Sequence, residues 1–181
     1  MKRLFFALWP DIAVRQLCVT EMRKLKAYGK PVLPANIHVT LLFLGATDAE
    51  RQRALSEFAS TIMIEPMVLA FDKLSYWKRP AVYCLTSSRG NTAVLALVER
   101  LSQAAANLGM DVDSRPFKPH VTLLRKARFS PLIDKIPQPI VWAADSFCLV
   151  ESCSMPSGVE YRVIKRWQAA ANFPTCRLSP D

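Results

Sequence analysis

The two histidines of this chain, His38 and His120, each open the same pentapeptide, HVTLL. Imidazole titrates at about pH 6.5, so one such group can act as an acid and the other as a base near neutrality. A threonine follows two residues later in each copy, Thr40 or Thr122, and on a strand such residues share a face at a separation of about 7 Å. Two such pairs across one cleft suit a phosphodiester, because the hydroxyls can hold its non-bridging oxygens while the imidazoles move two protons.

The duplication favours a functional role over a structural one. A single His-x-Thr on a strand is common, and a lone histidine is more often a satisfied core residue than a catalyst. Here both histidines of the chain stand at the head of identical pentapeptides. A zinc site is disfavoured, since two histidines lack the third and fourth ligands and no HExxH or Cys/Asp cluster accompanies them.

The surrounding pattern predicts the same order of elements in both halves: a strand, a helix, a loop and the HVTLL strand. The predicted strands are 3–9, 38–45, 67–74, 81–87 and 120–126, and the predicted helices are 12–28, a segment from Thr47 or Asp48 through Ile62, and 91–107. A further antiparallel pair, 144–152 with 159–167, is predicted around a turn at 155–158.

These elements predict an α+β fold built from a duplicated unit. Two lobes of antiparallel-rich sheet, with helices on the outer faces, would be related by a pseudo-two-fold axis that brings both HVTLL strands to a central cleft. We expect residues 1–181 to form a single domain, with motif one at 38–41 and motif two at 120–123.

The charge balance points to polyanionic partners. The chain has 24 lysines and arginines against 15 aspartates and glutamates, a net charge of +9. A field of this sign favours nucleic acids or nucleotides through counterion release and steering. The alternative is a basic surface that serves solubility only.

Cysteine usage and hydropathy indicate a reduced compartment and no membrane partner. No CxxC occurs among the five cysteines, so neither a disulfide framework nor a zinc knuckle is indicated. No apolar run approaches the roughly 18–20 residues that cross a bilayer, and the opening MKRLFFALWPD reads as a strand rather than a signal peptide. We expect a cytoplasmic monomer.

The paired motifs resemble those of the 2H phosphoesterase superfamily. More narrowly, the chain resembles the bacterial RNA 2',3'-cyclic phosphodiesterases, also called 2'-5' RNA ligases. The resemblance rests on RLFFALWP, NIHVTLLFLG, RPFKPHVTLLRKA and YRVIKRW, which span most of the chain in the order of the family. One departure is Tyr161-Arg162-Val163-Ile164, where the family usually has Tyr-x-Pro-Leu.

The resemblance implies an enzyme that opens 2',3'-cyclic phosphate ends of RNA to a 2'-phosphate, without metal or cofactor. His38 would be the general acid on the departing ribose oxygen and His120 the general base on water, with Thr40 and Thr122 as phosphate ligands. Alternatives within the class are 2'-5' RNA ligation and hydrolysis of ADP-ribose cyclic phosphate or 2',5'-oligonucleotides. The alternative of another class is an RNA-end-binding protein.

Arg125, just after the second copy, matches an arginine that the family uses on the cyclic phosphate. A guanidinium suits bidentate phosphate contact. Strict alternation, however, puts Arg125 on the face opposite His120, so it reaches the site only if the strand ends, twists or bulges. Phe43-Leu44-Gly45 follows the first copy and holds no arginine, so the two halves are expected to be unequal there.

Overall fold

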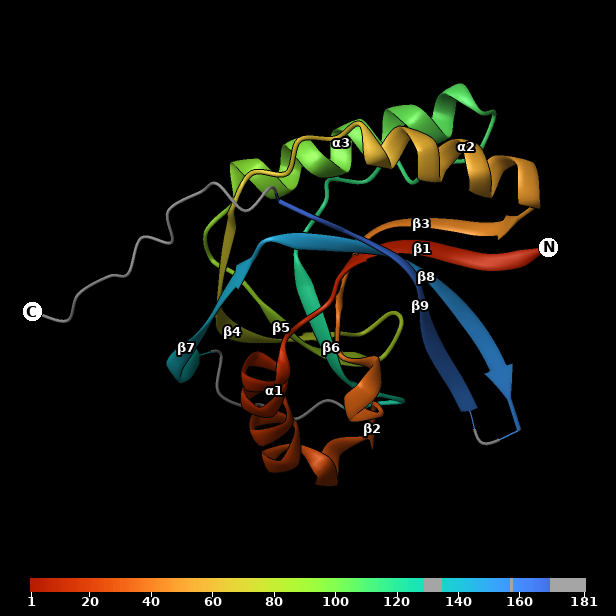
Figure 1. Cartoon of the computed structure of the whole chain (residues 1–181). Helices are drawn as coiled ribbons and strands as arrows, with labels where there is room; N and C mark the ends of the chain where they lie inside the picture. The colour runs from red at the N-terminus through yellow and green to blue at the C-terminus, as the bar shows by residue number, and fades with distance from the viewer. Residues whose placement is uncertain (129–134, 157, 170–181) are drawn as a thin grey trace, which may run out of the picture.

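The computed structural model describes residues 1–128, 135–156 and 158–169 and contains two antiparallel sheets (Figure 1). The four-stranded sheet has the order β3-β1-β8-β9, and the five-stranded sheet has the order β2-β6-β5-β4-β7. The strands are β1 Lys2–Leu8, β2 Lys30–Pro31, β3 Val39–Thr47, β4 Met67–Trp77, β5 Val82–Thr86, β6 His120–Arg125, β7 Lys135–Ala144, β8 Ser146–Met155 and β9 Gly158–Gln168.

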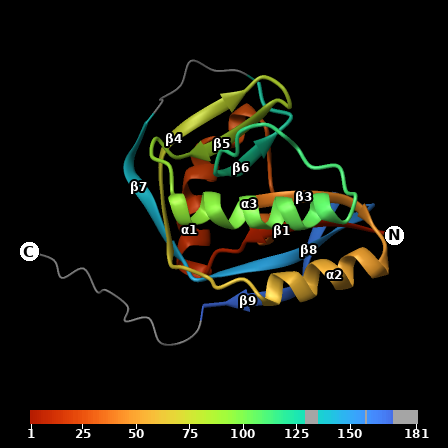
Figure 2. The ribbon, with the colours of Figure 1, turned by 90° about the horizontal axis from the view of Figure 1, so that it is seen from above.

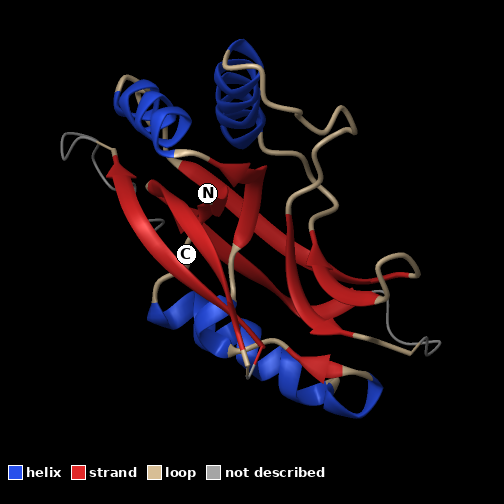
Figure 3. Ribbon diagram, turned by 90° about the vertical axis from the view of Figure 1, so that its right-hand side faces the viewer, coloured by secondary structure: helices blue, strands red, loops and turns tan. Residues whose placement is uncertain are grey.

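Three α-helices flank the sheets in the part of the chain that is described: α1 Ile12–Lys24, α2 Ala49–Ser60 and α3 Thr92–Asn107. Helices α2 and α3 lie on one side of the strands and α1 on the opposite side (Figures 1 and 3). Each begins at an Asx cap, Asp11, Asp48 or Asn91, whose side chain accepts from a backbone N–H three residues on. No helix within the described ranges has the length and hydropathy to span a membrane.

The two sheets share one hydrophobic core. In β1 the alternating residues Leu4, Phe6 and Leu8 are fully buried in the core cluster that also contains residues of both sheets and all three helices. The helix of the first half, α1, contacts β6 and β7, whereas α3 of the second half contacts β3. Helix α1 therefore packs on the sheet that carries the second HVTLL strand and α3 on the sheet that carries the first, and Figure 2 shows both sheets beneath α3. The predicted α+β fold with antiparallel sheets and outer helices is confirmed.

The predicted strands and helices are found, with shifts at their ends. The antiparallel pair β8–β9 is confirmed, and β3 continues through Gly45 to Thr47, because Gly45 adopts a φ of +69° without a side chain to oppose it. In α1 the buried residues are Val14, Cys18 and Met22, while Ile12 is 76% exposed. The apolar residues of this segment predict one buried stripe of Ile12, Leu17, Cys18, Met22 and Leu25. Burial of Cys18, Met22 and Leu25 agrees with that prediction, whereas it is wrong for Ile12 and for Leu17, which is 50% exposed.

Strand β7 was not predicted from the sequence. Its segment contains Pro137 and Pro139, and proline cannot donate to a ladder. The structure places β7 at the edge of its sheet, paired with β4 only. Prolines are tolerated at such an edge because the missing N–H has no partner strand to reach.

The loop that contains Gly29 packs closely on the end of the second HVTLL strand, and a substitution at Gly29 tests this contact. A Cβ at this position would lie 3.0 Å from both the Ala127 Cα and the Arg125 carbonyl oxygen. Because both atoms belong to backbone, Gly29→Ala is expected to lower the free energy of unfolding by about 1–3 kcal/mol, measured by chemical denaturation. Gly90→Ala is the control, since its Cβ meets nothing within 4 Å. Equal effects of the two substitutions would contradict this packing.

Candidate active site

The first HVTLL strand carries a β-bulge at its fourth residue. In the β1–β3 ladder Ala7 lies opposite Thr40 and Phe6 lies opposite Leu42, which leaves Leu41 as the extra residue. Leu41 and Leu42 are both buried. Alternation of faces is therefore interrupted just after the His-x-Thr pair, as a bulge requires.

The second HVTLL strand carries the same bulge at the equivalent residue. Cys84 lies opposite Thr122 and Tyr83 lies opposite Leu124, so Leu123 is the extra residue, and Leu123 and Leu124 are both buried. The extra residue shifts the alternation by one and returns Arg125 to the face of Thr122. The sequence allowed Arg125 to approach the histidines only if the strand ended, twisted or bulged, and the structure contains such a bulge.

His38 is held by hydrogen bonds at both ring nitrogens. Its Nδ1 lies 2.6 Å from the Asn36 carbonyl oxygen, which can only accept, so Nδ1 carries the hydrogen in the neutral ring. Nε2 is then left with its lone pair and accepts from the Thr40 hydroxyl at 3.0 Å. Thr40 and Nε2 therefore satisfy each other's hydrogen-bonding capacity.

The His38 ring lies in an aromatic pocket that favours its neutral form. Three rings pack on it with centroids at 5.1–5.8 Å: Phe5, Trp9 and Tyr161. Burial lowers the pKa of His38 to about 4, and the nearby positive charges of His120 and Arg125 act in the same direction against the Asn36 hydrogen bond. Because the charges of His120 and Arg125 act on His38, both groups lie near the first histidine.

His120 repeats the tautomer of His38 in more open surroundings. Its Nδ1 lies 2.8 Å from the Lys118 carbonyl oxygen, two residues earlier as in the first half. Trp77 is its aromatic neighbour, with ring centroids 4.6 Å apart. Burial lowers the pKa of His120, and Arg125 contributes. The hydroxyl of Thr122 lies 3.8 Å from the Cys84 sulfur, so the two threonines are held differently.

Taken together, the site presents two neutral imidazoles, two hydroxyls and an exposed guanidinium. Strands β3 and β6, which carry the two motifs, are in contact. Each imidazole has its Nδ1 anchored to a backbone carbonyl, which leaves Nε2 as the nitrogen with a free lone pair in the neutral ring. An anion bound between them would favour protonation of either ring. Within the described residues no three His, Cys, Asp or Glu side chains gather as ligands for a metal ion.

The depressed pKa of His38 can be measured directly. In an NMR titration of the ligand-free protein, the His38 ring is expected to stay neutral from pH 8 down to near its pKa of about 4, because protonation would place a charge in the aromatic pocket. His120 is expected to titrate below the ordinary value. Added inorganic phosphate should raise both pKa values. A His38 pKa of 6.5 or higher in the free protein would contradict the burial described here.

Several neighbours of the site were missed or underrated from the sequence. Asn36 forms two hydrogen bonds with β9. Its side-chain amide donates to the Val159 carbonyl at 2.7 Å, and the Tyr161 N–H donates to its Oδ1 at 3.2 Å. The same residue's carbonyl holds His38. The sequence signal that could have identified Asn36 is its position two residues before His38. Trp77, which the sequence pattern does not connect with the HVTLL strands, lies against His120.

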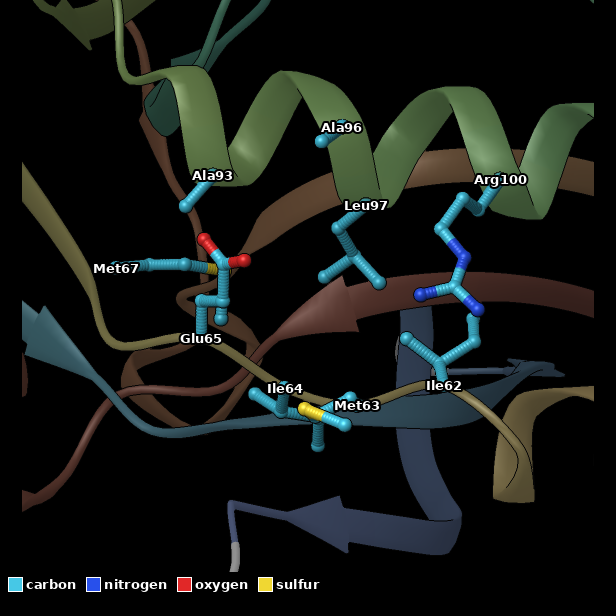
Figure 4. Close-up of a pocket in the computed structure, with 9 residues that line it drawn as sticks. All are labelled: Ile62, Met63, Ile64, Glu65, Met67, Ala93, Ala96, Leu97 and Arg100. Atoms are coloured by element: carbon cyan, nitrogen blue, oxygen red, sulfur yellow. The ribbon is translucent and has the colours of Figure 1, made fainter. Parts of the chain in front are cut away.

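The hollow shown in Figure 4 is separate from the histidines. It has a volume of about 60 Å³ and is lined by residues 62–65, by Met67 and by α3, with Glu65 and Arg100 as its charged residues. Its walls are otherwise apolar and contain no pair of groups suited to proton transfer.

The fold and the two His-x-Thr motifs define a protein of the two-histidine phosphoesterase class. The structure is similar to that of LigT from Escherichia coli, with a TM-score of 0.86 and 32% identity over 93% of this chain and 97% of that chain. A solved structure of the same protein with 3'-AMP gives the same TM-score and identity. A Thermus thermophilus structure, TT0787, has a TM-score of 0.77 at 27% identity, covering 92% of this chain and 97% of that chain.

The chain belongs to the 2'-5' RNA ligase superfamily, whose model matches residues 8–153. An Escherichia coli protein named RNA 2',3'-cyclic phosphodiesterase is 32% identical over 92% of this chain and 96% of its own length. A Thermus thermophilus protein of the same name is 27% identical over 91% and 89%. The resemblance found in the motifs is thereby confirmed.

Proposed function

We propose that this protein hydrolyses 2',3'-cyclic phosphate ends of RNA to 2'-phosphate ends by a two-histidine acid–base mechanism. The observation that carries the proposal is the shared site: two His–Thr pairs on identically bulged strands, with Arg125 acting electrostatically on both histidines. The names of the relatives support the substrate. The site is built from two lobes of a single domain, residues 1–181, with motifs at 38–41 and 120–123.

In this mechanism the phosphoryl oxygens are bound by the Thr40 and Thr122 hydroxyls and by Arg125. His120 takes a proton from water through Nε2, and the water oxygen forms a bond to phosphorus. The bond from phosphorus to the ribose O3' breaks, and Nε2 of His38 donates a proton to O3'. One water is consumed, and a 2'-phosphate and a 3'-hydroxyl are formed. The hydroxyls and the guanidinium stabilise the charge that develops on the phosphoryl oxygens.

The buried position of His38 makes its acid role depend on substrate. In the free protein its pKa of about 4 keeps it neutral near pH 7. A cyclic phosphate carries a negative charge, and its arrival next to His38 favours the imidazolium form. The proton needed by the departing oxygen is therefore gained as substrate binds, and exchange with solvent restores both rings after turnover.

Hydrolysis of an RNA oligonucleotide that ends in a 2',3'-cyclic phosphate tests the proposal. The reaction is run with excess chelator, and the product is identified by ³¹P NMR. The expected result is a 2'-phosphate formed at an undiminished rate, because the proposed steps use only groups of this chain. Loss of activity in chelator, or a 3'-phosphate product, would contradict the mechanism.

A second candidate reaction is 2'-5' RNA ligation, which the description of the superfamily supports. The same two histidines can serve it if the 5'-hydroxyl of another RNA replaces water as the nucleophile. Adding such an RNA to the assay shows which acceptor is preferred. ADP-ribose cyclic phosphate and 2',5'-oligonucleotides are tested as competing substrates, and RNA binding without turnover would favour an end-binding protein. A cytoplasmic location and a monomeric state remain predictions.

A further inference from the structure

Phe43 is the one exposed aromatic residue in the described part of the chain, with 48% of its surface accessible. In the β1–β3 ladder it lies opposite Phe5, and directly opposed residues share a face of the sheet. The Phe5 ring in turn packs on His38 at 5.1 Å. Phe43 thus lies on the face that carries the catalytic pair, about 10 Å beyond Thr40 along β3.

The ladders show that Phe43 occupies the place that Arg125 has in the second half. Beyond the bulge of each HVTLL strand, Phe43 pairs with Phe5 in one half and Arg125 pairs with Val82 in the other. The duplicated unit therefore has a phosphate-binding guanidinium at one position and an exposed phenyl ring at its equivalent. This inequality suits a substrate that is itself unequal on its two sides.

A cation accompanies the ring. The guanidinium of Arg3 lies over Phe43, 5.5 Å from the ring centroid, and within the described ranges no carboxylate lies within ion-pair distance of it. Phe43 also borders an open recess of about 380 Å³ whose lining includes Arg51 of α2, which is paired with Asp48, and Asp111. An exposed ring, an available guanidinium and a recess are the groups that bind a base and its phosphate in single-stranded nucleic acids.

We propose that Phe43 and Arg3 form a subsite for the RNA nucleotide on the 5' side of the cyclic phosphate. The base of that nucleotide stacks on Phe43 at the recess, and its phosphate is bound by Arg3. This inference rests on the proposed function. It deepens that function by making an RNA chain, rather than a free cyclic nucleotide, the preferred substrate of the site.

The test compares adenosine 2',3'-cyclic phosphate with a tetra-adenylate that ends in the same group. Phe43→Ala is expected to lower kcat/KM on the tetranucleotide by about 10-fold, through KM, since base stacking on aromatic rings contributes at this scale. On the mononucleotide the expected change is less than about 2-fold. Arg3→Gln is expected to lower kcat/KM on the tetranucleotide by several-fold and to weaken its salt dependence.

Two matched variants serve as controls. Leu95→Ala removes an apolar side chain of similar exposure, 43%, from α3. Lys2→Gln removes the neighbouring charge, which is paired with Glu151. Neither should discriminate between the two substrates. Equal losses on both substrates for Phe43→Ala, or no loss on the tetranucleotide, would overturn the subsite, whereas failure of the unsubstituted protein to hydrolyse even the mononucleotide would overturn the proposed function and the subsite with it.

Discussion

Replacement of His38 or His120 by alanine is expected to lower kcat on a cyclic-phosphate substrate by about 10²–10⁴-fold each, the range of a lost general acid or base. KM should change little, because Thr40, Thr122 and Arg125 remain to bind the phosphate. The measurement is steady-state kinetics in chelated buffer. Added imidazole should restore part of the activity, since each substitution leaves a cavity with the shape of the imidazole ring that was removed.

The pH profile separates this expectation from a structural role for the histidines. The kcat/KM profile of the unsubstituted protein should be bell-shaped with both limbs below pH 6.5, because burial lowers the pKa of both rings. The acid limb reports protonation of the base, and the alkaline limb reports deprotonation of the acid. Since the charge of His120 acts on His38, the limbs belong to the pair. Each alanine variant should lose one limb, and full activity in either would rule out the mechanism.

Arg125→Gln is expected to lower kcat/KM by about 10²–10³-fold, because in the proposed mechanism the side chain contacts charge that develops on the phosphoryl oxygens. Lys126→Gln is the matched control. It removes the same charge from the adjacent exposed residue, which does not appear among the causes of either histidine's pKa shift. Its expected effect is less than about 3-fold, as for a lost solvent-exposed charge.

A second readout distinguishes phosphate binding by Arg125 from support of the strand. Arg125 contributes to the lowered pKa of both histidines, so Arg125→Gln should raise both values in an NMR titration, while Lys126→Gln should leave them unchanged. Arg125→Lys keeps the charge without the bidentate fork and should recover the pKa values but only part of the activity. Equal activities for Arg125→Gln and Lys126→Gln would contradict the assignment.

The sequence by itself determined the chemistry and most of the elements. Two histidines at the head of identical pentapeptides predict acid–base work on a phosphodiester, and the local patterns around them predict the strands and helices because apolar periodicity and Asx caps act within a few residues. The prediction failed where context overrides such signals. The prolines of β7 are compatible with a strand only at an edge, and the buried face of α1 leaves out the apolar residues Ile12 and Leu17.

Only the tertiary structure decided which side chains share the site. Arg125 joins the histidines because cross-strand pairing places a bulge at Leu123, and the same pairing puts Phe43 at the equivalent position in the first half. The low pKa of His38 arises from Phe5, Trp9 and Tyr161, which come from β1, the segment after it and β9. Register and burial depend on partners far away in the chain, and a local pattern does not contain them.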